Sequence, residues 1–160
     1  MSVPASHVSQ HASLHTQPFL AADVGGTHAR VALLRAPAGA RREIEGLAYR
    51  KFTCADFPGL PELLSAFIER DATLQVRRCV IACAGQAIDD TVINDNLAWR
   101  VSLSQLREAL AFDDVALLND FEALGYALDD VRSTDSLLLC GPDTHGDGPA
   151  LVVGPGTGLG

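Results

Sequence analysis

Two short apolar runs joined by a pair of glycines constrain the fold of this chain more than any other feature. Residues 19–24 read FLAADV, residues 29–34 read ARVALL, and Gly25 and Gly26 stand between them. Such runs, separated by a Gly-Gly turn, are typical of a β-hairpin, because glycine adopts the backbone angles that a tight turn needs. The sequence therefore predicts a β-sheet that begins at Phe19.

The apolar pattern further along the chain predicts helices that alternate with buried strands. Residues 43–54 alternate roughly, as a third strand would, and residues 77–85 form a continuous apolar run. We also expect helices within 57–72, 102–112 (capped by Ser102 or Ser104) and 120–128, and strands at 114–120 and 150–154. This order of elements predicts an α/β fold with a mixed sheet and flanking helices.

Changes in composition along the chain suggest three segments. Residues 1–17 are polar and rich in Ser and His, so we expect a disordered extension. Residues 18–130 are expected to form a small α/β lobe, and the glycine-rich stretch that follows suggests that residues 131–160 begin a second, larger lobe. Because the sequence stops in a glycine loop with nothing to pack against, we expect it to be the N-terminal part of a longer protein.

Composition argues against several classes of partner. Hydrophobic residues make up 48% of the chain and charged residues 20%, which indicates a globular protein. The net charge of -8 argues against a nucleic-acid partner. There is neither a signal peptide nor an apolar run near the roughly 18 residues of a transmembrane helix, so no membrane association is expected. The four cysteines lack the paired spacing of a zinc site, which favours reduced thiols and a cytoplasmic location.

Two glycine loops, each placed after an apolar run, are candidates for binding phosphate. The first contains Gly25, Gly26 and Thr27, and the second contains Gly156, Thr157 and Gly158. Glycine lets backbone N–H groups approach an oxyanion closely, and threonine adds a hydroxyl donor. Neither loop matches a P-loop or a dinucleotide-binding fingerprint. One loop in each lobe suggests a phosphate chain held between them.

Polar residues at three places in the sequence are candidates for the remaining chemistry, and each place has a structural alternative. Asp23 ends an apolar strand, where it would hold Mg²⁺ or merely start a turn. Asn119 and Asp120 stand at the carboxyl end of another strand, where open α/β sheets display ligands. Asn119 and Glu122 also match a capping box, which would leave Asp120 free to act as a general base. Asn96, near the only tryptophan, Trp99, suits a sugar, although a loop of Asn and Asp is often only a loop.

Five motifs in order resemble those of the bacterial ATP-dependent glucokinases, which belong to the hexokinase and actin-like ATPase superfamily. They are D-V-G-G-T-x-A-R at 23–30, C-A-G at 83–85, N-x-x-W at 96–99, N-D-F at 119–121 and G-x-G-T-G-L-G at 154–160. The resemblance covers the chain from about residue 18 onward. It implies a ribonuclease-H-like mixed sheet with flanking helices, which is the small lobe of an actin-like ATPase fold.

The resemblance also implies a role for each candidate residue. Asp120 would deprotonate the 6-hydroxyl of glucose for attack on the γ-phosphate of ATP, in a reaction that belongs to glycolysis. Asn119 and Asn96 would bind the sugar, and Asp23 would support Mg²⁺. The phosphate loops would be formed by Gly25, Gly26 and Thr27 and by Gly156, Thr157 and Gly158. A homodimer is expected of the full-length protein.

The sequence departs from the family pattern at several positions, which leaves other functions possible. Position 28 is His where many relatives carry Asn, and residues 84–86 lack a proline that is common there. The family's further sugar ligands, a Glu and a Glu-x-x-His set, have no counterpart in these 160 residues, so we expect the isolated chain to have little or no kinase activity. The alternatives are another hexose kinase of the superfamily, or a sugar-binding or nucleotide-binding regulator of the actin-like fold without catalytic activity.

Overall fold

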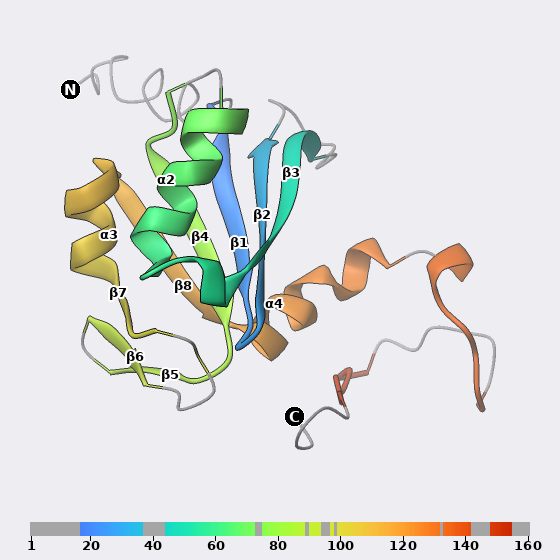
Figure 1. Cartoon of the computed structure of the whole chain (residues 1–160). Coiled ribbons are helices and arrows are strands. Elements are labelled where there is room, and N and C mark those ends of the chain that lie inside the picture. Colours follow the sequence, from blue (N-terminus) through green and yellow to red (C-terminus); the bar gives the residue numbers. More distant parts are fainter. Residues whose placement is uncertain are drawn as a thin grey trace, which may run out of the picture.

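A five-stranded mixed sheet forms the centre of the molecule. The computed structural model describes residues 17–36, 44–72, 75–88, 90–93, 97, 99–131, 133–141 and 148–154. In the order β3-β2-β1-β4-β8, the sheet contains β3 (Glu45–Thr53), β2 (His28–Arg35), β1 (Phe19–Val24), β4 (Arg78–Cys83) and β8 (Asp114–Asn119). β1, β2 and β3 pair antiparallel, whereas β4 lies parallel to both β1 and β8 (Figure 1). The predicted hairpin and the predicted mixed α/β sheet are confirmed.

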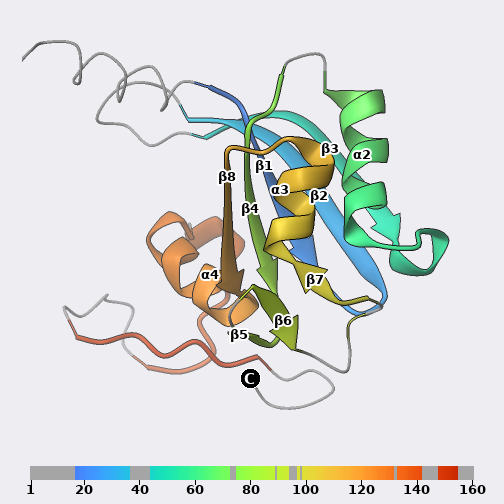
Figure 2. The same cartoon turned by 90° about the vertical axis from the view of Figure 1, so that its left-hand side faces the viewer.

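Helices cover both faces of this sheet. α2 (Leu60–Asp71) and α3 (Leu103–Leu110) lie on one face, and α4 (Asp120–Ala127) lies on the other (Figure 2). Short 3₁₀ turns, η1 (Cys54–Asp56), η2 (Leu128–Asp130) and η3 (Ser133–Asp135), follow β3 and α4. The three helices were expected at these places from the apolar spacing.

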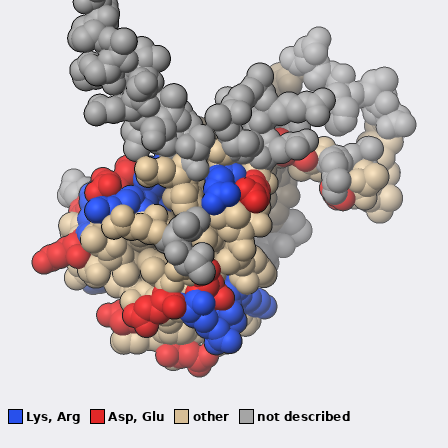
Figure 3. All heavy atoms as spheres, turned by 90° about the horizontal axis from the view of Figure 1, so that it is seen from above, with Lys and Arg blue, Asp and Glu red and all other residues tan. Residues whose placement is uncertain are grey.

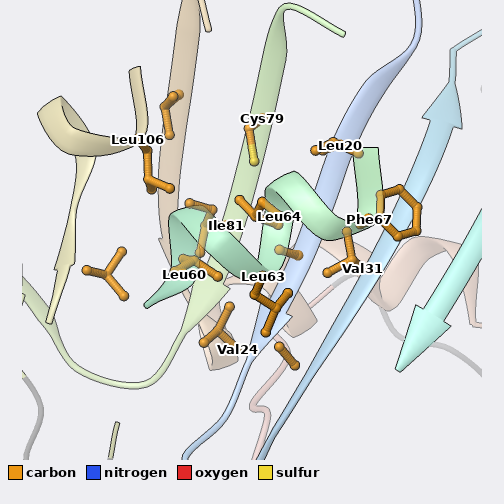
Figure 4. Close-up of a cluster of buried hydrophobic side chains, with 14 of the residues drawn as sticks. Leu20, Val24, Val31, Leu60, Leu63, Leu64, Phe67, Cys79, Ile81 and Leu106 are labelled. Atoms are coloured by element: carbon orange, nitrogen blue, oxygen red, sulfur yellow. The ribbon is translucent and has the colours of Figure 1, made fainter. Parts of the chain in front are cut away.

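The hydrophobic core lies between the sheet and α2. β1 alternates so that Leu20, Ala22 and Val24 face α2, and the helical spacing of the leucines on α2 turns them toward the sheet (Figure 4). Phe67 is fully buried among them. Burying a side chain of this kind stabilises the fold by about 1.5–3 kcal/mol. Pro61 is tolerated because it lies in the first turn of α2, where its missing N–H group would have no helical partner.

The start of α3 is fixed by a cluster of hydroxyl and carboxylate groups. Ser102 is the N-cap, since its Oγ accepts a hydrogen bond from the backbone N–H of Gln105 at 3.3 Å. The Asp90 carboxylate accepts bonds from the backbone N–H of Ser104 at 3.0 Å and from the Ser102 hydroxyl at 2.8 Å. The hydrogen bonds from the hydroxyl and the backbone N–H of Ser104, together with the bond from Ser102, hold the pKa of Asp90 below its usual value. Of the two expected caps, Ser102 is therefore the one used.

Two sequence-based expectations about strands were wrong. Residues 150–154 form no strand, because no strand among the described residues lies beside them to pair with. Conversely, a small sheet of β5 (Gln86–Ile88), β6 (Thr91–Ile93) and β7 (Val101–Ser102) was not expected. Its strands are two or three residues long, which is too short to show an alternating pattern.

Opposite charges pair at the end of the sheet that lies away from the β1–β2 turn. Arg35 contacts Glu45 at 3.2 Å, and Arg77 contacts Asp113 at 3.3 Å. Figure 3 views the molecule from this end and shows basic and acidic side chains beside one another. Exposed pairs of this kind contribute about 0–1 kcal/mol each, and the predicted site residues lie elsewhere.

Among the helices that the structure describes, none has the length and apolar character that crossing a membrane requires.

Candidate functional site

Three of the sequence motifs meet at one end of the central sheet. Val24, Cys83 and Asn119 are register partners at the carboxyl ends of β1, β4 and β8. The β1–β2 turn follows Val24, the C-A-G loop follows Cys83, and α4 follows Asn119 at the lower end of the sheet in Figure 1. The carboxyl ends of parallel strands are where open α/β sheets bind ligands. The structure thus brings together motifs that lie about a hundred residues apart in the chain.

The β1–β2 turn (residues 25–27) presents backbone N–H groups to solvent. The Gly25 N–H donates to the carbonyl of His28 at 3.0 Å. Gly26 and Thr27 are exposed, and their N–H groups have no hydrogen-bond partner in the described part of the chain. Among the described residues only Gly85 and Gly141 are glycines with a positive φ, so Gly25 and Gly26 do not serve the turn by adopting such an angle. Because neither glycine carries a side chain, the backbone at these two positions is bare, which is a geometry that lets an anion approach N–H groups.

Asp23 lies within β1 and points to solvent. Its Oδ2 accepts a hydrogen bond from Nη1 of Arg30, its register partner on β2, at 2.8 Å, and both side chains are 51% exposed. The alternative that Asp23 starts the turn was therefore wrong, since its carboxylate is bound to Arg30. Within the described ranges, no three His, Cys, Asp or Glu side chains gather as a metal site. One exposed carboxylate still fits Mg²⁺, which commonly uses one or two carboxylates and takes its other ligands from phosphate and water.

Asn119 caps α4 through a complete capping box. Its Oδ1 accepts from the N–H groups of Phe121 at 2.9 Å and Glu122 at 3.4 Å, and the Glu122 carboxylate accepts from the Asn119 N–H at 3.4 Å. The Asn119 Nδ2 donates to the carbonyl of Gly85 at 3.4 Å. The alternative that Asn119 caps a helix is thus confirmed. Its amide also links α4 to the loop after β4 through the hydrogen bond to Gly85.

Asp120 is not needed for this cap. It is the first residue of α4, is half-buried, and accepts one hydrogen bond from the Phe121 N–H through Oδ1 at 3.0 Å. Burial, together with the charge of Asp120, raises the pKa of the Cys83 thiol to about 11. The carboxylate therefore lies close to the end of β4, with its second oxygen unbonded among the described residues.

Two residues that hold the loops of this site in place, Gly85 and Cys54, were not predicted as functional. Gly85 has a φ of 114°, which only glycine adopts readily, and its carbonyl receives the Asn119 amide. The C-A-G motif was the only sequence signal for it. Cys54 of η1 donates its N–H to the carbonyl of Thr27 at 2.9 Å and its thiol to the carbonyl of Gly25 at 3.4 Å. It lies about 29 residues further along the chain, in no recognised motif.

The segment that leads toward the second glycine loop packs beside the start of α4. A Cβ atom added to Gly154 would lie 2.5 Å from Cζ of Phe121, so the backbone of Gly154 touches the ring of the residue after Asp120. Three residues predicted for the phosphate site, Gly156, Thr157 and Gly158, lie outside the described residues, as does Asn96 of the predicted sugar site.

Trp99 is held on the lobe by its own hydrogen bond. Its indole N–H donates to the carbonyl of Phe57 at 2.9 Å, and the half-buried ring packs against the core. An open depression of about 610 Å³ lies beside it, lined by Pro58, Gly59, Pro61, Glu62, Trp99, Arg100, Gln105, Glu108 and Ala109. Because none of the predicted catalytic or phosphate-binding residues lines it, this depression is separate from the site at the strand ends.

Comparisons with known sequences agree on one family. The glucokinase family model matches residues 20–160. A glucokinase-like protein of Xylella fastidiosa is 47% identical over 143 residues, and a glucokinase of Neisseria meningitidis is 36% identical over the same length. In both cases the match covers 89% of this chain and 42% of the relative, so the chain spans less than half the length of these relatives.

Comparisons with solved structures agree on the fold. A glucokinase from an Antarctic psychrotroph superposes with a TM-score of 0.65 at 32% identity, over 73% of this chain and 36% of that one. A ROK hexokinase from Thermus thermophilus superposes with a TM-score of 0.57 at 19% identity, over 74% of this chain and 40% of that one. The mixed sheet is thus that of sugar kinases with the actin-like ATPase fold.

Proposed function

Because the chain belongs to the glucokinase family, we propose that it forms the N-terminal part of a glucokinase, which transfers the γ-phosphate of ATP to the 6-hydroxyl of glucose. The observation that carries the proposal is the meeting of the β1–β2 turn, the C-A-G loop and Asp120 at the carboxyl ends of β1, β4 and β8. Phosphoryl transfer depends chiefly on positioned donors, a metal ion and one carboxylate, and this end of the sheet offers exposed N–H donors and the carboxylates of Asp23 and Asp120.

The β1–β2 turn is proposed to bind the terminal phosphates of ATP. Gly26 and Thr27 are exposed, their N–H groups have no partner among the residues that the structure describes, and the Thr27 hydroxyl adds a donor. Gly156, Thr157 and Gly158 are proposed as the opposite side of the phosphate site. The contact between Gly154 and Phe121 supports this, because it leads the chain toward the same strand ends.

Asp23 is proposed to hold Mg²⁺, directly or through water. The metal ion would neutralise charge on the phosphates during transfer. Arg30 holds the Asp23 carboxylate in place, at 2.8 Å from Oδ2, and leaves Oδ1 for the metal or its water.

Asp120 is proposed as the general base, and Asn119 and Asn96 as sugar ligands. A base needs a carboxylate oxygen free to reach the attacking hydroxyl, and among the described residues only Oδ1 of Asp120 accepts a hydrogen bond. The Asn119 Oδ1 serves the helix cap, so its contribution to the sugar is a donor N–H on Nδ2, which carries a second proton beyond the one given to Gly85.

The broader properties of the protein remain predictions. They are a small lobe at 18–130, a large lobe that begins at 131, a homodimer and a cytoplasmic location. Closure of two lobes over the sugar would exclude water, which would otherwise accept the phosphate. The isolated 160-residue chain is expected to show little or no turnover, and near-normal turnover would contradict this.

The test is a coupled phosphorylation assay of the complete gene product carrying Asp120→Asn. Turnover is expected to fall by about 10²–10⁴-fold while the affinity for Mg·ATP is retained, because the substitution removes only the base. The matched control is Asp114→Asn at the opposite end of the same strand, which should leave turnover unchanged. Retained turnover in Asp120→Asn would refute the assigned base. Glucose binding without turnover in the unmodified protein would favour the non-catalytic regulator instead.

A further inference from the structure

Cys54 holds both ends of the β1–β2 turn. Its backbone N–H donates to the Thr27 carbonyl at 2.9 Å, and its thiol donates to the Gly25 carbonyl at 3.4 Å. Cys54 itself is held by η1, in which its carbonyl accepts from the Phe57 N–H at 3.2 Å. One residue of the segment that follows β3 therefore fixes two carbonyl groups of the turn.

These two bonds fix the direction of an N–H group of the turn as well. The Gly25 carbonyl and the Gly26 N–H belong to one planar trans peptide unit, in which the two groups point in opposite directions. When the Gly25 carbonyl points inward to the Cys54 thiol, the Gly26 N–H must point outward. Since Gly26 is exposed, its N–H is presented to solvent at the end of the sheet where Asp120 lies.

We propose that Cys54 is a positioning residue of the phosphate-binding turn, which aims the Gly26 N–H at the nucleotide; the proposal rests on the function proposed above. Cys54 is 0% exposed, and burial raises the pKa of its thiol. The thiol thus remains protonated, and a hydrogen-bond donor, at neutral pH. A buried protonated thiol is a poor nucleophile, so Cys54 acts through the turn and not on the substrate.

The experiment uses amide hydrogen exchange and ¹⁵N spectra of the 160-residue chain, with Cys54→Ala, Cys54→Ser and a control, Cys79→Ala. Cys79 is also a buried thiol, 1% exposed, but it pairs with Leu20 at the other end of β1. Both alanine variants lose a similar buried group, and only Cys54→Ala loses a bond to the turn. The Gly25 amide, which is bonded to the His28 carbonyl, reports the order of the turn.

In Cys54→Ala, the Gly25 amide is expected to exchange about fivefold faster than in Cys79→Ala, as loss of one hydrogen bond predicts. Cys54→Ser is expected to restore most of the protection, because a hydroxyl also donates. Equal Gly25 exchange in the two alanine variants would overturn the proposal, and so would a serine variant no better than alanine.

Titration with Mg·ATP separates this proposal from the proposed function. In the unmodified chain, the Gly26 and Thr27 amide resonances are expected to shift on titration, and Cys54→Ala is expected to weaken the apparent affinity by about fivefold. If the unmodified chain shows no shift, phosphate binding by this turn is refuted in the chain. The exchange rates then still decide whether Cys54 orders the turn.

Discussion

The part of the chain up to Asn119 and the segment from Asp120 to Gly154 differ in how far their large apolar side chains are buried. In the first region, most of the large apolar residues of β1, β4 and α2 are buried. In the second, α4 has no buried residue, and Tyr126, Leu137, Leu139 and Leu151 are 72%, 82%, 86% and 87% exposed. The first region forms a core from its own residues, whereas the second region buries few of its large side chains within the described chain.

This difference indicates what each region contributes to the candidate site. The first supplies a rigid edge, because the ends of β1, β4 and β8 are fixed by the core beneath them. An exposed apolar surface such as that of the second region usually marks a contact with further protein. The site lies at the boundary between them, with Asp120 as the first residue of the second region.

Substitutions of large apolar side chains should differ most in effect between the two regions. Phe67→Ala is expected to lower the free energy of unfolding by about 3–5 kcal/mol, because it leaves a cavity between α2 and the sheet. Leu139→Ala should change it by less than about 0.5 kcal/mol, since the side chain is 86% exposed. Urea unfolding followed by the fluorescence of the single tryptophan, Trp99, measures both. A similar loss in the two variants would show that the second region also has a core.

The loop after β4 lies in the first region, at the edge of the sheet that carries the candidate site. A substitution of Gly85 tests how rigid this loop is. Gly85→Ala is expected to cost about 1–3 kcal/mol, because a φ of 114° strains any residue with a Cβ. Gly46→Ala in β3 is the control, since a Cβ there meets nothing within 4 Å and φ is not positive. Thermal unfolding of the two variants compares them, and an unchanged melting temperature in Gly85→Ala would show that the loop relaxes without cost.

Regular periodicity explains how much of the first region could be predicted from the sequence. The strand–glycine–strand pattern predicted β1 and β2, and the spacing of Leu63, Leu64 and Phe67 predicted α2. The apolar run before Asn119 and Asp120 predicted their place at the carboxyl end of a strand, which is the edge where open α/β sheets bind ligands.

The remaining features depend on contacts that no local pattern records. Cys54 reaches the turn through a tertiary hydrogen bond, and Arg30 reaches Asp23 through strand register. The apolar run at 150–154 predicted a strand, yet a strand exists only when a neighbour supplies hydrogen bonds. Local propensity alone does not provide that neighbour.

At the boundary between the two regions, substitutions of Asn119 separate its capping role from its proposed sugar role. Asn119→Ala is expected to cost about 1 kcal/mol, because α4 loses the acceptor for two backbone N–H groups. Asn119→Asp should keep the cap, since Asp caps as well as Asn, but it loses the amide donor and with it the hydrogen bond to the Gly85 carbonyl. Amide exchange in α4 measures the cap, and glucose affinity of the complete gene product measures the donor. Unchanged α4 exchange in Asn119→Ala would rule out the cap as a source of stability.

The smallest expected effect is an acid dependence that arises within the first region. Arg50 on β3 binds both carboxylate oxygens of Asp71, the last residue of α2, at 2.7 and 2.8 Å, which lowers the pKa of Asp71. Since the folded pKa lies below the unfolded value near 3.9, the pair stabilises the fold above about pH 4, and this contribution is lost as the pH falls through the folded pKa. Asp71→Asn should therefore lower stability at neutral pH and flatten its decline in acid. Asp113→Asn, in the more exposed pair with Arg77, is the control in urea unfolding at several pH values. Equal pH dependence in Asp71→Asn and the unmodified chain would show that the link between α2 and β3 does not depend on this charge.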